Sequence, residues 1–271
     1  MFIQEALRVP PPPRNTGIAR CYAKYIYLFK NICNNSDMKH HINKYFGFTL
    51  AEVLITLGII GVVAALTLPA LINNTNKKEL ETAFKKQYSI LQQAITMIKA
   101  EDAIDFTYDN YGYNSGNTRF GTRLAQQFKS AQDCGNINNN VGCILKEDDG
   151  SFNAYKSYTG KTISAAYFDD GGFISPDGTL YMFEQGDQSK ESGFIVSIDV
   201  NGFKKRPNKM GYDLFMFQIT QDGKILPMGA EGTSFAWGIH SLCDENSTSN
   251  MNGFTCAYHA MTDNNYFKNL K

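Results

Sequence analysis

A single ionisable side chain, that of Glu52, lies within an otherwise apolar stretch of 25 residues that runs from Phe48 to Ile72. About 20 apolar residues are enough for a helix to cross a bilayer, so this stretch predicts a membrane-spanning helix. A carboxylate inserted in such a helix costs about 3 kcal/mol, and such groups usually have a partner or a function. Glu52 is therefore the first candidate functional residue, although near the helix start it would also reach the aqueous interface.

The position of Glu52 in the sequence suggests a partner for its carboxylate. A cut between Gly47 and Phe48 would create a new α-amino group four residues before Glu52. The carboxylate of one subunit and the terminal amine of its neighbour would then neutralise each other in an apolar bundle and set the register of the subunits. We therefore expect Glu52 to be an assembly contact.

The residues around this expected cut resemble a known signal. Residues 47–55, Gly-Phe-Thr-Leu-Ala-Glu-Val-Leu-Ile, resemble the class III signal of type IV pilins, type II secretion pseudopilins and competence pilins. The resemblance implies that prepilin peptidase cuts after Gly47 and N-methylates Phe48, and that Glu52 is needed for assembly. It also implies polymerisation with itself and with other pilins or pseudopilins, by an inner-membrane assembly platform and a cytoplasmic ATPase.

The chain is expected to have four parts. Residues 1–47 form a basic leader that is removed, with seven Lys or Arg against two acidic residues. Because leaders of this family are usually short, we expect translation to start at Met38 and residues 1–37 not to be translated; the alternative is a long leader that is translated and discarded. The other parts are the transmembrane and filament-core helix (48–72), its amphipathic continuation (73–102) and an exported domain (103–271).

The charge distribution predicts how the chain is oriented. Residues 48–271 hold 19 basic and 24 acidic residues, a balance of −5, against +5 for residues 1–47. Basic segments stay on the cytoplasmic side, so we expect one pass through a bacterial inner membrane and an extracytoplasmic C-terminal domain. Membrane lipid surrounds the helix before assembly into a periplasmic or surface filament. The acidic body argues against nucleic acid as a partner.

Two features shape the predicted helix. Pro69 lacks a backbone donor and clashes with the preceding turn, so we expect a helix break there, as a kink or a melted stretch. Beyond Ile72, apolar residues recur every three or four positions, which predicts a helix that packs one face on a sheet. These residues are Leu80, Phe84, Tyr88, Leu91, Ile95 and Ile98.

The exported part predicts an antiparallel sheet, because short apolar runs alternate with turn residues. With the helix, this gives an α+β fold, and the resemblance implies the pilin arrangement of a long N-terminal helix packed on such a sheet. Residues 105–118 are expected to form a loop, and residues 119–131 to contain a short helix. The expected strands are Gly172–Ile174, Thr179–Phe183, Phe194–Asp199, Leu214–Thr220 and Ile225–Leu226.

Four cysteines remain after the leader, and an even number in an exported domain predicts disulfides. Sequence proximity favours the pairs Cys134–Cys143 and Cys243–Cys256 among the three possible connectivities. The alternative is a zinc site, because His240 and Cys243, and then Cys256 and His259, have zinc-ligand spacing. Two nearby cysteines in an oxidising compartment more often pair with each other.

Four oxygen-bearing side chains lie between two expected strands. Asp199, Asn201, Asn208 and Asp213 offer the ligands that calcium accepts. The major pseudopilins of type II secretion bind calcium in a broadly similar region, but the residues match loosely. Asx residues also stabilise turns without a metal. No cofactor is required by this interpretation, and calcium is the one candidate.

Two other classes of function compete with a filament subunit. A membrane-anchored extracytoplasmic binding module or adhesin would use the pilin-type signal for processing alone, with Tyr108, Tyr111 and Tyr113 as a recognition surface. An enzyme is not expected, because the exported part has no Ser/His/Asp order, nucleophile elbow or phosphate-binding loop. The adjacent carboxylates at 148–149 and 169–170 have no base or nucleophile beside them.

Overall fold

The computed structural model describes residues 48–112, 114–115, 119–135, 143, 155–163, 169–185, 193–235 and 242–270. Gly47 and the expected start at Met38 lie outside the described residues, as do Tyr113 and His240. The chain divides into two units, Met1–Ile60 and Gly61–Lys271, and helix α2 (Leu50–Asp102) has residues in both.

Helix α2 runs without interruption through Pro69, so the melted stretch expected there is wrong, and the kink stays a prediction. A proline removes only its own N–H donor, and the hydrogen bonds of the flanking turns keep the backbone helical. The nearby Thr67 hydroxyl also donates to the carbonyl of Val63 at 2.9 Å. Among the described residues, α2 is the one helix long and apolar enough to cross a membrane.

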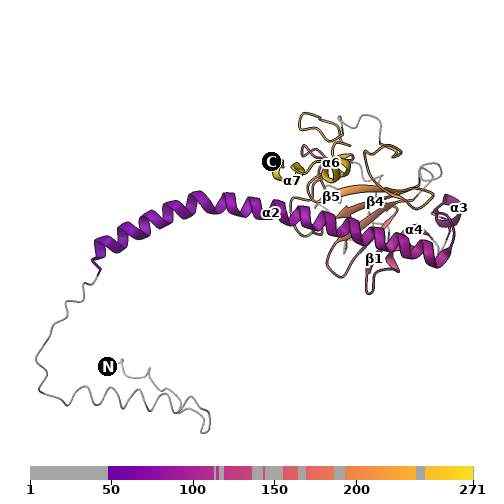
Figure 1. Cartoon of the computed structure of the whole chain (residues 1–271), viewed down its shortest axis with the longest axis horizontal. Coiled ribbons are helices and arrows are strands. Elements are labelled where there is room, and N and C mark those ends of the chain that lie inside the picture. The colour runs from indigo at the N-terminus through magenta and orange to yellow at the C-terminus, as the bar shows by residue number, and fades with distance from the viewer. Residues whose placement is uncertain are drawn as a thin grey trace, which may run out of the picture. The chain divides into compact units, whose positions relative to one another are not determined.

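The second half of α2 packs on a six-stranded antiparallel sheet (Figure 1), so the fold is α+β as predicted. Phe84, Leu91, Ile95 and Ile98 are buried, and the apolar stripe read from the sequence is the face that contacts the sheet. The strands follow one another in chain order: β1 (Gln132–Gly135), β2 (Gly171–Ile174), β3 (Leu180–Glu184), β4 (Phe194–Asp199), β5 (Leu214–Ile219) and β6 (Ile225–Pro227).

Both faces of the sheet are covered. Because side chains alternate along a strand, Phe194, Val196 and Ile198 of β4 join the core with α2, and Ile195 joins a second core on the opposite face. The second core includes Tyr155, beneath the loop that joins β4 to β5. This two-sided burial explains why β4 and β5 are apolar along most of their length.

Four short helices complete the described part of the chain: α3 (Tyr108–Tyr111), α4 (Phe120–Ala125), α6 (Cys256–Thr262) and α7 (Tyr266–Asn269). Helix α4 is the short helix expected within residues 119–131. Helix α3 lies in the segment expected to be a loop, and there the prediction is wrong. Thr107 precedes α3 with extended backbone angles, so its single turn begins at Tyr108. Near the chain end, α6 and α7 had no sequence-based prediction.

Candidate functional site

The amino end of α2 carries a capping box that the sequence also contains as Thr49-x-x-Glu52. Glu52 Oε2 accepts hydrogen bonds from the backbone N and the hydroxyl of Thr49, each at 2.8 Å. In return, Glu52 N donates to Thr49 Oγ1 at 3.2 Å. This reciprocal pattern satisfies helix donors that would otherwise lack partners. Glu52 therefore also stabilises the first turn of its own helix, a role that the Thr49-x-x-Glu52 spacing indicates.

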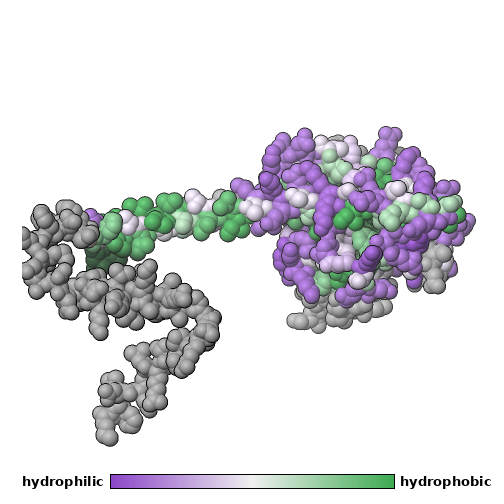
Figure 2. Space-filling model, turned by 60° about the horizontal axis from the view of Figure 1, so that its bottom comes forward, coloured by the Kyte–Doolittle hydropathy of each residue, from purple (hydrophilic) through white to green (hydrophobic). Residues whose placement is uncertain are grey.

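Most side chains of the apolar stretch that follows are exposed in the single chain. Phe48 is 88% exposed, and Leu50, Ile60 and Leu66 are each at least 60% exposed. Figure 2 shows that the exposed part of α2 is mostly hydrophobic. A continuous apolar surface of this length is stable only in lipid or against other helices. Glu52 is the one charged group on it.

A second candidate site lies in the loop that joins β4 to β5. Asp199 ends β4 and lies opposite Leu214, the first residue of β5, so Asp213 is held beside it. Both aspartate side chains are fully buried. Burial raises the pKa of each carboxyl above its usual value, and the charge of Asp213 raises that of Asp199 further. Two buried carboxylates without a cation are electrostatically unfavourable.

The polar groups of this loop converge on the two carboxylates. Asp199 Oδ1 accepts from the backbone N of Gly202 at 2.9 Å, and its Oδ2 accepts from the Tyr155 hydroxyl at 2.5 Å. The backbone N atoms of Asn208 and Lys209 donate to Asp213 at 2.8 and 2.6 Å. Each carboxylate oxygen therefore has a donor, and these bonds brace the loop.

Two amide oxygens in the same loop have no hydrogen-bond donor in the part of the chain that the structure describes. They are Asn201 Oδ1 and Asn208 Oδ1, which are both buried, while the Asn201 side chain donates to Asp213. A buried acceptor without a partner costs about 1 to 3 kcal/mol, so such groups are rare unless an ion or water completes them. Two carboxylates and two amide oxygens are a donor set that fits calcium. Within the described ranges, no three His, Cys, Asp or Glu side chains gather to hold a metal ion, so a calcium site in this loop would depend on the amide oxygens as well as the two carboxylates.

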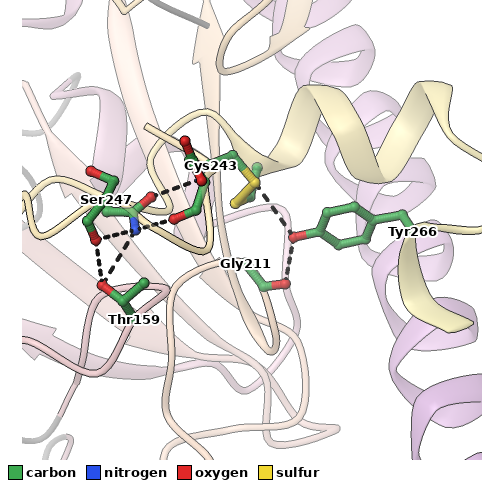
Figure 3. The surroundings of a disulfide bond; sticks show 8 residues. Thr159, Gly211, Cys243, Ser247 and Tyr266 are labelled. Carbon is green, nitrogen blue, oxygen red and sulfur yellow. Dashed lines mark hydrogen bonds between the residues drawn. A yellow bond between two sulfur atoms is a disulfide. The ribbon is translucent and has the colours of Figure 1, made fainter. Parts of the chain in front are cut away.

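The cysteines form both disulfides that sequence proximity favoured. Cys134 bonds to Cys143 and Cys243 bonds to Cys256. The Tyr266 hydroxyl donates to the carbonyl of Gly211 at 2.7 Å and lies 3.9 Å from Cys243 Sγ (Figure 3). These contacts tie the C-terminal helices to the loop before β5.

The zinc alternative does not hold in this structure. The sulfur atoms of Cys243 and Cys256 are bonded to each other, so neither is the thiolate that zinc coordinates. The proposed ligand His240 lies outside the described residues.

The tyrosines expected to form a recognition surface include a core residue. Tyr111 is fully buried and stacks on Phe106 with ring centroids 5.1 Å apart. Its hydroxyl donates to Asp102 Oδ2 at 2.7 Å, and Arg123 also binds that carboxylate. Tyr111 therefore closes the C-terminal end of α2 and is not available for recognition.

Comparison with known proteins identifies the N-terminal segment. Residues 42–68 match the family model described as the prokaryotic N-terminal methylation motif. No curated protein and no solved structure matches the chain. The chain therefore carries the signal of type IV pilins and pseudopilins. That signal implies processing by prepilin peptidase and assembly with other pilins, and the apolar helix fits an inner-membrane anchor.

Proposed function

We propose that the chain is a structural subunit, not an enzyme, of a filament assembled at a bacterial inner membrane, as a type II secretion pseudopilin or a type IV pilin. The supporting observation is that the methylation motif at residues 42–68 ends in a helix with an exposed apolar surface and one carboxylate, Glu52. Prepilin peptidase cuts after Gly47 and methylates Phe48. An assembly platform and its cytoplasmic ATPase then polymerise the processed chain.

In this mechanism Glu52 acts as the charge that aligns neighbouring subunits. Among the described residues, its carboxylate is bound by Thr49, within its own first turn. The terminal amine of an adjacent subunit remains protonated after methylation and neutralises this carboxylate in the apolar bundle. The apolar side chains that follow leave lipid and pack on neighbouring helices, where van der Waals contact holds them.

Substitution of Glu52 by Gln tests this role. We expect the Glu52→Gln chain to be inserted and processed but to lose disulfide crosslinks between cysteines introduced on the apolar helices of neighbouring subunits. Glu79→Gln, which changes an exposed acid of α2 beyond the apolar stretch, should retain them. Crosslinks that persist in Glu52→Gln would contradict the role. A wild-type chain that stays monomeric in the membrane would favour the membrane-anchored binding module or adhesin.

A second proposal concerns calcium, which would be held by Asp199, Asn201, Asn208 and Asp213. The two orphaned amide oxygens beside two buried carboxylates support it. The cation would neutralise the carboxylates and fix the loop between β4 and β5. The ion would have a structural role.

Thermal unfolding tests calcium binding without reference to assembly. A ligand at 100 times its dissociation constant stabilises the folded state by about 2.7 kcal/mol. We expect calcium, but not an equal concentration of magnesium, to raise the melting temperature of the wild-type domain. The double change Asp199→Asn with Asp213→Asn should abolish this shift, and Asp109→Asn on the surface should leave it intact. An unchanged wild-type melting temperature in saturating calcium would contradict the proposal.

A further inference from the structure

A groove of about 500 Å³ lies between the first polar turns of α2 and the loop that joins β4 to β5. Cations predominate among the charged groups of its lining. Of the charged side chains that line the groove, four are basic and two are acidic, whereas residues 48–271 as a whole carry more acidic than basic groups. The charged lining residues are Lys77, Glu79, Lys86, Asp177, Lys205 and Arg206.

The cations at the loop side of this groove are available to a ligand. Lys86 is already paired with Asp177 at 2.6 Å, and Lys77 donates to the carbonyl of Lys268 at 3.1 Å. Lys205 and Arg206 are exposed, and no carboxylate within the described parts of the chain forms an ion pair with either. The groove therefore presents positive charge that no carboxylate of the described residues neutralises by an ion pair.

The groove also lies at a defined distance from the apolar stretch. Asn73 and Lys77 line it, and they directly follow Ile72, the last residue of that stretch. Five helical residues span about 7.5 Å. The head-group layer on each side of a bilayer is about 5 to 8 Å thick. When the apolar stretch lies in hydrocarbon, the first residues of the groove lie at the depth of the lipid head groups.

We propose that this groove binds the anionic head groups of phospholipids in the leaflet that the exported domain faces. The proposal rests on the membrane anchorage proposed above and adds a lipid-binding surface to it. An anionic bilayer repels an acidic domain and attracts its cationic face, so Lys205 and Arg206 would orient the domain before the subunit enters a filament. Each unpaired cation at an anionic surface strengthens such docking about fivefold.

Energy transfer in nanodiscs tests the proposal with the processed chain, residues 48–271. The chain carries Trp237→Phe and Tyr212→Trp, so that its one indole lines the groove, and the discs contain a dansyl head-group acceptor. We expect transfer to be about twofold greater in phosphatidylglycerol than in phosphatidylcholine at low salt. It should fall to the phosphatidylcholine level near 0.5 M salt, where the screening length is about 4 Å, and added inorganic phosphate at matched ionic strength should not reduce it.

Two charge-matched pairs of substitutions locate the effect. Lys205→Glu with Arg206→Glu, or the milder Gln pair, should remove the dependence on phosphatidylglycerol. Lys99→Glu with Lys224→Glu makes the same charge change at the other end of the packed helix, where Lys99 binds the carbonyl of Asp222, and should leave the dependence intact.

Three outcomes would overturn the proposal. The first is equal energy transfer in phosphatidylglycerol and phosphatidylcholine discs. The second is an equal loss of the dependence on phosphatidylglycerol with both pairs of substitutions. The third is transfer that rises with the number of chains per disc, which would assign the groove to a second copy of the chain. Incorporation of the chain into the discs is scored separately by co-elution, so a failed anchor is distinguished from a failed groove.

Discussion

The Tyr181 hydroxyl of β3 donates a hydrogen bond of 2.7 Å to Oε1 of Gln87 on α2, within the otherwise apolar contact of helix and sheet. The amide nitrogen of Gln87 in turn donates to Thr179 Oγ1 at 2.7 Å and to Asp177 Oδ2 at 3.0 Å. One buried amide therefore serves three groups of the β2–β3 hairpin. Because buried polar groups need partners, these bonds specify which turn of α2 lies over that hairpin.

Removal of this amide should destabilise the domain. Gln87→Leu leaves the Tyr181 hydroxyl and the hairpin acceptors without their partner, so we expect a loss of about 2 to 3 kcal/mol in the free energy of unfolding. Gln92→Leu, at an exposed position of the same helix, should change it by less than about 0.5 kcal/mol. Urea unfolding of both variants measures the difference. Equal losses would show that the hydrogen bonds of Gln87 do not hold helix and sheet in register.

Asp177 should make the stability depend on pH in the acid range. Partial burial raises the pKa of its carboxyl, but hydrogen bonds from Lys86, Ser175 and Gln87 outweigh burial and hold the pKa well below its usual value. A depressed folded-state pKa stabilises the folded state above the unfolded pKa of about 3.9, and this contribution is lost as the pH falls towards the folded value.

We therefore expect Asp177→Asn to be less stable than wild type at pH 7, by roughly 1 kcal/mol at this partly screened site. The gap should narrow below about pH 4, since wild type then loses its carboxylate and the variant has none to lose. Urea midpoints between neutral and acid pH provide the measurement. A stability difference between wild type and Asp177→Asn that does not change with pH would show that these contacts do not lower the pKa of Asp177.

Gly202 should tolerate no side chain, because its φ is +82° and a Cβ there would lie 2.2 Å from the carbonyl oxygen of Gly178. Gly160 is the matched control, with a φ of +87° and no atom within 4 Å of its Cβ position. Alanine at Gly160 meets only the left-handed backbone, at about 1 kcal/mol. Gly202→Ala adds a backbone clash, so we expect about 2 kcal/mol more loss. Similar free energies of unfolding for Gly202→Ala and Gly160→Ala would contradict the close contact between Gly202 and the carbonyl of Gly178.

The Cys243–Cys256 disulfide should contribute strongly to stability. The cysteines are 13 residues apart, and closing a loop of about 15 residues stabilises a fold by about 3 kcal/mol in the chain-entropy picture. We expect Cys243→Ala with Cys256→Ala to lower the free energy of unfolding by that amount. The loss should be at least as great as that of Cys134→Ala with Cys143→Ala, whose cysteines are nine residues apart. Denaturant unfolding under non-reducing conditions measures both, and an unchanged midpoint for the first variant would contradict the assignment.

The apolar strands were predictable because their composition reflects burial on both faces. The prediction for Phe194–Asp199 has the bounds of β4, and that for Leu214–Thr220 exceeds β5 by one residue. Strand β1, Gln132–Gly135, was missed because its residues are polar and mostly exposed, and pairing with β2 alone makes it a strand. The sequence pattern of a short segment does not reveal a strand that forms only by pairing with a neighbouring strand.

The residues of the candidate sites could be predicted from the sequence, but their burial and their contacts could not. The sequence predicts Asp199 and Asp213 as candidate calcium ligands, yet their full burial follows from the pairing of β4 with β5. The bond between Gln87 and Tyr181 is invisible in a sequence, because 94 residues separate them. The capping box of Thr49 and Glu52 is readable from the sequence, because its two residues lie three positions apart.

The most direct test of the central account is the identity of the mature N-terminus. Protein isolated from membranes or sheared filaments of the native host is digested, and its N-terminal peptide is analysed by mass spectrometry. The account predicts a peptide that begins with Phe48 and carries one added methyl group on its amine. A mature chain that still contains residues before Gly47, or begins elsewhere with an unmodified amine, would contradict it.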